Sequence, residues 1–334
     1  MTKILGIGNA LVDSEFTVTD PQLTATTLTK GNMTLASSSE QAELVASLKN
    51  QNITAHKQAS GGSGANSIFA IASLGNQALY LCRVGDDEQG KFYLDDLQQG
   101  GVATLATATT QGGTTGSCMV LVTPDGERTM QTFLGTSAEL DEQNIDFNDP
   151  QLQAFGAGDW LYIEGYLAFN PTAQTAIQQL KAFARDKQMK VAVSFADPAV
   201  VKFGREGIDS MLAGGVDAVF CNAEEAMIFT NQPTIEQASQ DLLKVTSLAV
   251  VTNGAKGTCV TTSEQTLAIE AEPVAQVVDT NGAGDNFAGA FLFGLSKGYD
   301  LAKCGKLASQ VAGKVIGQFG ARLAVNEYQA IYAN

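Results

Sequence analysis

Histidine is almost absent from this chain, which contains one, His56, in 334 residues. A Ser-His-Asp triad or a histidine-based zinc site would have to rest on that single residue, so we set both hypotheses aside. The five cysteines are widely spaced and form no CxxC pair. We therefore expect buried, reduced thiols.

Basic residues are scarce as well: 20 Lys and Arg stand against 35 Asp and Glu, a formal charge of −15. Such a surface repels polyanions, so we expect no nucleic-acid partner. No apolar run reaches the roughly 18 residues of a membrane span, so we expect no membrane partner. The opening MTKILGIGNALVD is typical of a buried first strand rather than a signal peptide, which indicates a cytoplasmic location.

Short apolar segments alternate with helical patterns along most of the chain. Six segments predict strands, at 4–8, 78–84, 160–164, 190–195, 217–221 and 248–252. Five patterns predict helices, at 66–74, 88–99, 171–188, 223–229 and 234–245. This alternation predicts an α/β protein with a mostly parallel sheet covered by helices on both faces.

Two regions interrupt the alternation. Residues 14–36 are rich in Thr and Ser, and residues 113–134 have the pattern of a hairpin around a PDGE turn at 124–127. We expect neither region to be helical. Together they predict a small β-rich lid, from about 14–36 and 104–135, on a single domain that spans residues 1–334.

The strongest chemical signal is DTNGAGD, directly before an apolar helical pattern. Gly282, Ala283 and Gly284 have little or no side chain, so their N–H groups can point outward at a helix N-terminus and bind an anion. Asp285 follows them, where a carboxylate could take the proton of an attacking hydroxyl during phosphoryl transfer. An ordinary N-capping aspartate after a glycine turn explains this spacing equally well.

Longer motifs support the first of these two interpretations. DTNGAGDNFAGAF at 279–291 resembles the C-terminal signature of the ribokinase (PfkB-type) family of sugar and nucleoside kinases. The family's earlier signature is similar to GGSGAN at 61–66, followed by GNQALYLCRVGDDEQG at 75–90. The resemblance extends from GNALVD at residue 8 to FGA at 319–321, essentially the whole chain.

This resemblance implies a ribokinase-like three-layer α/β fold, with a central mostly parallel sheet and a small β-rich lid. It also implies ATP and Mg as cofactors. By analogy with the family, Asp285 is the catalytic base. The amides of Gly282, Ala283 and Gly284 would form the anion hole.

The resemblance also implies an acceptor site near the N-terminus. An acid in the position of Asp13 binds acceptor hydroxyls in the family, and a carboxylate can accept two bonds from a vicinal diol. Gly61 and Gly62 would let the acceptor approach the backbone closely, and Asn66 would add a side-chain donor and acceptor. From the residues alone, a surface aspartate and an ordinary glycine turn remain the alternative.

The nucleotide half is implied by two further motifs. Asn222 and Glu225, in NAEE, resemble the family's NxxE motif, in which the glutamate would bind Mg through water. A helix cap explains the same residues. Thr252, Gly254 and Gly257, in TNGAKG, resemble the turn that lines the nucleotide, and a simple hairpin turn is the alternative.

Three weaker points concern the cation and the acceptor. Asp279 and Thr280 resemble the elements that hold a monovalent cation, potassium, in many members. Arg128, after the lid turn, would either reach the acceptor or lie exposed. ADPA at 196–199 replaces the DxNxR segment of many sugar-specific members, and GNALVD and GGSGAN are closer to adenosine-kinase-like members.

We therefore expect an ATP-dependent kinase for a hydroxyl of a sugar or nucleoside. One alternative is a kinase for a phosphorylated sugar, which the scarcity of basic residues around Asp13 and Gly62 disfavours. Another is a non-catalytic sugar- or nucleoside-binding regulator, which has no need of Asp285. An NAD-dependent dehydrogenase is disfavoured by its incomplete glycine fingerprint. The protruding lid also offers a sheet edge for a homodimer.

Overall fold

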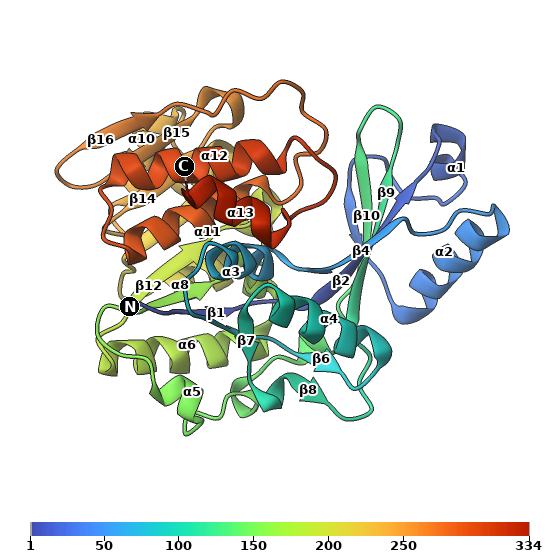
Figure 1. The fold of residues 1–334 in the computed structure, drawn as a ribbon, viewed down its shortest axis with the longest axis horizontal. Coiled ribbons are helices and arrows are strands. Elements are labelled where there is room, and N and C mark those ends of the chain that lie inside the picture. The colour runs from blue at the N-terminus through green and yellow to red at the C-terminus, as the bar shows by residue number, and fades with distance from the viewer. Residues whose placement is uncertain (1, 334) are drawn as a thin grey trace.

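The computed structural model describes residues 2–333, and its main body is built on a nine-stranded sheet (Figure 1). The strand order is β16-β15-β14-β13-β12-β11-β1-β5-β7, with antiparallel pairing only at β15 and β16. Its strands are β1 Ile4–Ile7, β5 Ala78–Leu81, β7 Val102–Thr104, β11 Trp160–Ile163, β12 Lys190–Ser194, β13 Ala218–Asn222, β14 Ala249–Thr252, β15 Thr258–Thr261 and β16 Thr266–Ile269. All six strands predicted from the sequence are confirmed.

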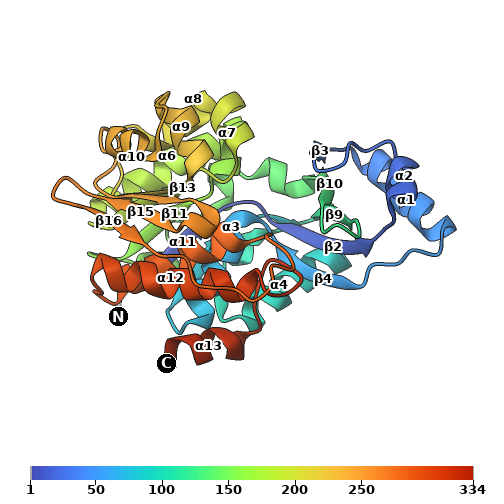
Figure 2. The same ribbon diagram turned by 90° about the horizontal axis from the view of Figure 1, so that it is seen from above.

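Helices cover both faces of this sheet (Figure 2). One face carries α3 Ser63–Ser73, α4 Glu88–Gln99, α11 Ala283–Ser296, α12 Leu301–Val315 and α13 Val325–Ala333. The other carries α5 Pro150–Gln153, α6 Pro171–Asp186, α7 Pro198–Phe203, α8 Arg205–Leu212, α9 Ala223–Thr230 and α10 Ile235–Leu242. Each face of the sheet has its own hydrophobic core. Ile4 on β1 packs into the core under α3 and α11, and the next residue, Leu5, packs into the core under α6, because strand side chains alternate between faces. The predicted three-layer fold is confirmed.

Short elements complete the body. They are the strand pair β6 Val84–Gly85 and β8 Thr109–Thr110, and the 3-10 turns η1 Ala106–Ala108, η2 Gly135–Glu139, η3 Glu142–Asn144, η4 Gly165–Phe169 and η5 Gly254–Lys256. Across residues 2–333, no helix is both long enough and apolar enough to cross a membrane.

The lid is a five-stranded sheet that projects from one side of the body (Figures 1 and 2). Its strands are β2 Leu11–Thr17, β3 Met33–Leu35, β4 Lys57–Gly61, β9 Gly116–Val122 and β10 Arg128–Phe133, in the order β3-β10-β9-β2-β4. The helix α2 Ser38–Asn50 packs on it through Leu44 and Leu48. The lid therefore differs from the predicted segments. Residues 57–61 belong to it because they pair with β2, whereas residues 106–110, predicted as lid, form η1 and β8 of the body.

The prediction that residues 14–36 contain no helix is wrong. Helix α1, Asp20–Thr24, forms inside this segment. Thr19 and Gln22 make a reciprocal capping box, and Pro21 lies in the first turn. These two start signals stabilise a short helix even where the neighbouring residues are poor helix formers.

Candidate active site

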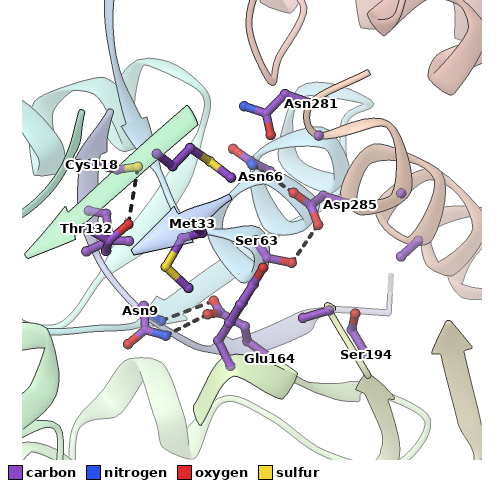
Figure 3. Close-up of a pocket in the computed structure, with 18 of the residues that line it drawn as sticks. Asn9, Met33, Ser63, Asn66, Cys118, Thr132, Glu164, Ser194, Asn281 and Asp285 are labelled. Carbon is purple, nitrogen blue, oxygen red and sulfur yellow. Dashed lines mark hydrogen bonds between the residues drawn. The ribbon is translucent and has the colours of Figure 1, made fainter. Parts of the chain in front are cut away.

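A cavity of about 520 Å³ lies between the lid and the carboxyl ends of the parallel strands (Figure 3). Parallel strands present their carboxyl ends at one edge of a sheet, where ligands of open α/β proteins bind. Asn9 follows β1, Glu164 follows β11, and Asn222 ends β13, and all three line the cavity. From the lid, β3, β9 and β10 contribute the opposite wall.

Most of the predicted site residues line this cavity, although they come from distant parts of the chain. Those that do are Asp13, Gly62, Asn66, Asn222, Glu225, Thr252, Thr280, Gly282, Gly284 and Asp285. Those that do not are Gly61, Ala283, Gly254, Gly257 and Asp279.

Asp285 lies in the first turn of α11, and its carboxylate is held from two sides. Ser63 Oγ donates to Oδ1 at 2.5 Å, and Asn66 Nδ2 donates to Oδ2 at 2.9 Å (Figure 3). Burial raises the pKa of Asp285 above its ordinary value, against the lowering effect of these two bonds and of Arg322. A carboxylate that is both oriented and more basic than usual is suited to accept a proton.

The start of α11 presents free backbone amides. Gly282 is the N-cap at φ +71°, and a side-chain Cβ there would lie 2.4 Å from the Ala321 carbonyl oxygen. Ala283 N–H donates to the Thr280 carbonyl at 3.3 Å, whereas the amides of Gly282 and Gly284 donate to no group within residues 2–333. First-turn amides lack intrahelical partners and attract anions, so this turn can bind a phosphate.

Asp13 projects from β2 and is half-buried in the cavity wall. Its carboxyl accepts no hydrogen bond from any side chain or amide within residues 2–333. Burial raises its pKa to about 7, although Arg322 and Arg128 act in the opposite direction. A Cβ on Gly61 would lie 2.2 Å from Asp13 Oδ1, so this glycine leaves room for the carboxyl. A half-buried carboxyl that has no donor among these residues calls for a ligand that supplies one.

Arg322 was not singled out from the sequence, although it directly follows the FGA motif. Its side chain is buried, and Nε donates to Asn66 Oδ1 at 2.7 Å. The guanidinium also lies over the Phe69 ring, 4.6 Å from its centroid. Because Arg322 takes the oxygen of Asn66, the amide nitrogen of Asn66 faces Asp285.

Among the other cavity residues that were not predicted are Asn9, Ser63 and Glu164. Burial raises the pKa of Glu164 to about 7. The available signal was its position, since an acid directly after an apolar strand falls at the carboxyl edge of the sheet. Ser63 and Asn9 lie inside motifs that the sequence does carry, GGSGAN and GNALVD.

Asn222 and Glu225 form the helix cap that was the alternative interpretation of the NAEE motif, at the start of α9. Both residues also line the cavity. Asn222 Oδ1 accepts from the Glu225 amide at 2.9 Å, and its Nδ2 donates to Glu225 Oε1 at 2.6 Å. Burial raises the pKa of Glu225 to about 7, and the nearby carboxyls Asp197 and Asp285 add to this. Thr252 lies next to Asn222 in the register of β13 and β14.

No group of three or more His, Cys, Asp or Glu side chains within residues 2–333 could hold a metal ion by itself. Magnesium keeps several waters and often uses one carboxylate together with substrate phosphates. The carboxylate of Glu225, which faces the cavity among other acids, fits this role because a cation would relieve their mutual repulsion.

Of the two positions considered for Arg128 from the sequence, the exposed one is wrong, and contact with the acceptor stays a prediction. Its guanidinium is largely buried and pairs with Glu15 at 2.7 Å and with Asp279. Asp279 also accepts from the amides of Asn281 at 2.9 Å and Gly320 at 2.7 Å. The carboxylate of Asp279 is thus already neutralised by a lid arginine, and the monovalent-cation site stays a prediction.

Comparison with known proteins matches this fold and these motifs. Residues 32–327 match the model of the pfkB family carbohydrate kinases. A fructokinase from Vibrio alginolyticus is 31% identical over 72% of this chain and 78% of its own. An adenosine kinase from Saccharomyces cerevisiae is 26% identical over 88% of this chain and 89% of its own.

Two solved structures are similar over nearly the full length. The adenosine kinase from Sinorhizobium meliloti has a TM-score of 0.87 at 34% identity, covering 98% of both chains. A probable sugar kinase from Rhizobium etli has a TM-score of 0.86 at 32% identity, also covering 98% of both. Since the family model matches most of the sequence and the fold agrees throughout, this chain belongs to the pfkB family of carbohydrate kinases.

Proposed function

We propose that this protein transfers the γ-phosphate of ATP to a hydroxyl of a nucleoside, with adenosine as the first candidate. The observation that carries the proposal is the position of Asp285. It is a buried, doubly hydrogen-bonded carboxylate at an amide-rich helix start. It shares the cavity with Asp13, an acid that accepts no hydrogen bond from residues 2–333.

In the proposed reaction, Asp13 binds acceptor hydroxyls and presents the reacting one to Asp285. Asp285 takes its proton as the oxygen attacks the γ-phosphorus, and the bond to the ADP oxygen breaks. The amides of Gly282 and Gly284 face the charge on the transferred group. Bound magnesium, held by Glu225 through water, would neutralise phosphate charge. Positioning of these groups by rigid elements supplies much of the rate.

The part of the cavity at the ends of β13 and β14 is proposed to bind ATP. Asn222 and Thr252 end these adjacent strands and line the cavity there. Gly254 and Gly257 lie just beyond, both with positive φ, and shape the turn after β14. They would act through the backbone they position, since neither lines the cavity itself.

The lid wall favours a nucleoside over a free sugar. Met33 and Leu35 are 44% and 60% exposed, and both line the cavity together with Val120 and Met130. Exposed apolar side chains inside a cleft indicate an apolar ligand surface, such as a nucleobase. Within the described chain, no Lys or Arg lines this cavity, which argues against a phosphorylated sugar.

The test of the proposal is phosphorylation of a panel of nucleosides and sugars with ATP and magnesium, for wild type beside Asp285→Asn. We expect one nucleoside to be turned over, and kcat to fall at least about 1,000-fold in the variant, because its amide cannot accept the proton. Acceptor binding, measured by calorimetry, should persist. Binding without turnover in wild type would instead support the regulator, and full turnover in the variant would remove Asp285 as base.

A free sugar is the second candidate, because similar proteins include a fructokinase and a probable sugar kinase. The variant Met33→Ser distinguishes the two candidates. Loss of apolar contact should raise the KM for a nucleoside about tenfold and leave the KM for a sugar unchanged. An unchanged KM for the nucleoside would show that the base does not contact β3.

Two predictions from the sequence stay open. The cation site at Asp279 and Thr280 would be tested by titrating potassium at constant ionic strength. The homodimer through the lid would use an edge of the lid sheet, β3 or β4, and sedimentation would test it.

A further inference from the structure

Glu164 is a buried carboxylate surrounded by hydrogen-bond donors. It is 1% exposed and directly follows β11. Oε2 accepts from the amides of Asn9 at 3.1 Å and Gly64 at 2.8 Å and from the Tyr80 hydroxyl at 3.4 Å. Oε1 accepts from Asn9 Nδ2 at 2.8 Å (Figure 3). The Tyr80 hydroxyl shares its one hydrogen with the Asn9 carbonyl, 3.0 Å away, so three N–H groups are the main donors that compensate the cost of burying this carboxylate.

Two glycines make room for this carboxylate. A Cβ on Gly8 would lie 2.2 Å from Glu164 Oε2, and a Cβ on Gly64 would lie 2.7 Å from the same oxygen. These glycines belong to the GNALVD and GGSGAN motifs, which lie far apart in sequence. The two motifs therefore meet at Glu164. Each of them has a glycine at the position that contacts the Glu164 carboxylate.

Glu164 also caps α3 from a distance. The local N-cap of α3, Gly62, has no side chain to bond the first amides. The carboxylate of Glu164 takes the Gly64 amide instead, and a negative charge is favourable at a helix N-terminus. The same first turn of α3 carries Ser63 and Asn66, the two residues that hold Asp285.

We propose that Glu164 is a positioning residue for phosphoryl transfer: by joining Asn9 to the first turn of α3, it orients Ser63 and Asn66 toward Asp285. The inference rests on the proposed role of Asp285 as base. Glu164 does not touch the reacting atoms in this account. It acts through α3 on Asp285 and through Asn9 on the wall of the acceptor cavity.

The test is Glu164→Gln, because the amide retains the size of the side chain but turns one acceptor into a donor that faces Asn9 Nδ2. We expect kcat to fall about 10- to 100-fold, the size of an effect transmitted by a small misplacement of the base, while the KM for ATP stays within about twofold. Asp159→Asn is the matched control. Asp159 is also buried, but it directly precedes β11, at the opposite end of the strand from Glu164. Its carboxylate accepts hydrogen bonds from the Lys3 and Gly156 amides. Its variant should keep wild-type kcat.

A double-mutant cycle with Ser63→Ala separates positioning from simple stabilisation. If Glu164 acts through the first turn of α3, the two losses in kcat should overlap, and the double variant should lose clearly less than their product. Independent, multiplicative losses would overturn the proposal, as would wild-type kcat in Glu164→Gln. If that variant does not fold, Gly64→Ala keeps the carboxylate but displaces it, and should give the same selective loss of kcat.

The result for Asp285→Asn separates this inference from the proposed function. Should Asp285→Asn retain turnover, the proposed base is wrong whatever Glu164 does. If Asp285→Asn is inactive while Glu164→Gln and Gly64→Ala both keep wild-type kcat, the base stands and the positioning role fails.

Discussion

At the scale of single residues, the cavity wall carries several carboxyl groups and, among residues 2–333, no Lys or Arg. Asp13, Glu164, Glu225 and Asp285 all line it, and burial raises the pKa of each. Titratable groups with displaced pKa values concentrate at functional sites because catalysis needs them. The division of labour among them follows from their contacts. Asp285 and Glu164 are held by donors, whereas Asp13 is available to a ligand.

Replacing Asp13 by Asn should weaken acceptor binding. Two hydrogen bonds from hydroxyls to a carboxylate would become weaker bonds to a neutral amide. Charged hydrogen bonds contribute about 1.5–3 kcal/mol each, so we expect the KM for the acceptor to rise on the order of 10- to 100-fold. The KM for ATP should not change. Initial-rate kinetics with each substrate varied would measure this, and an unchanged acceptor KM would refute the assignment of Asp13.

The same carboxyl makes folding stability depend on pH. Its folded pKa of about 7 lies above its ordinary value of 3.8, so the folded protein binds more protons between these limits. Its contribution to the free energy of unfolding is therefore full at low pH and is lost as pH rises toward 7. We therefore compare the melting temperature of Asp13→Asn with that of wild type at two pH values. We expect the variant to have the higher melting temperature, and the difference to be larger at pH 8 than at pH 5. An equal difference at both pH values would contradict the raised pKa of Asp13 in the folded protein.

At the scale of elements, the start of α11 combines a tight turn with a reactive side chain. Gly282 adopts φ +71° and packs on the Ala321 carbonyl, which leaves no space for a methyl group. Two residues later, a Cβ on Gly284 would meet no other atom within 4 Å. One helix start thus contains a glycine that the backbone requires and one that it does not.

The variants Gly282→Ala and Gly284→Ala should therefore differ in stability. Gly282→Ala should lower the free energy of unfolding by about 1–3 kcal/mol, through positive φ and the contact with Ala321. It should also lower kcat about 100-fold by moving an amide of the anion hole. Gly284→Ala should leave stability unchanged or raise it by up to about 1 kcal/mol, since alanine favours a helix. Urea unfolding would measure both, and equal losses of stability would refute the distinction.

At the scale of the whole molecule, one arginine joins the lid to the body. Arg128 on β10 pairs with Glu15 on β2 and with Asp279 beside the start of α11. Both acids are buried, at 5% and 4% exposure. The contact links the position of the lid to the loop that precedes the anion hole. Lid closure that excludes water is a common device in phosphoryl transfer.

Arg128→Met should destabilise the protein strongly, because it leaves two buried carboxylates unpaired. We expect a loss of about 3–5 kcal/mol in the free energy of unfolding. The matched control is Lys244→Met, which removes the exposed ion pair with Asp241 and should cost on the order of 0.5 kcal/mol or less. Denaturant unfolding measures both variants. A loss for Arg128→Met as small as the control would mean that the lid is not held by this pair.

Much of the fold and the centre of the site could be predicted from the sequence, because their signals are local. The six strands, α4 and the start of α6 at Pro171 follow from periodicity and caps over a few residues. Asp285 and its glycines form one continuous motif. The short helix α1 is not predicted, because its capping signal covers only a few residues of a Thr-rich segment and threonine is a poor helix former.

What only the tertiary structure decided lies in contacts between distant residues. Arg322 meets Asn66 across 256 positions, Glu164 meets Gly64 across 100, and Arg128 meets Asp279 across 151. No local pattern encodes such pairs, because they arise where separate strands end at one sheet edge. The sequence by itself determined which residues can do the chemistry. Packing of the lid, β11 and α3 around one cavity decided which residues hold them in place.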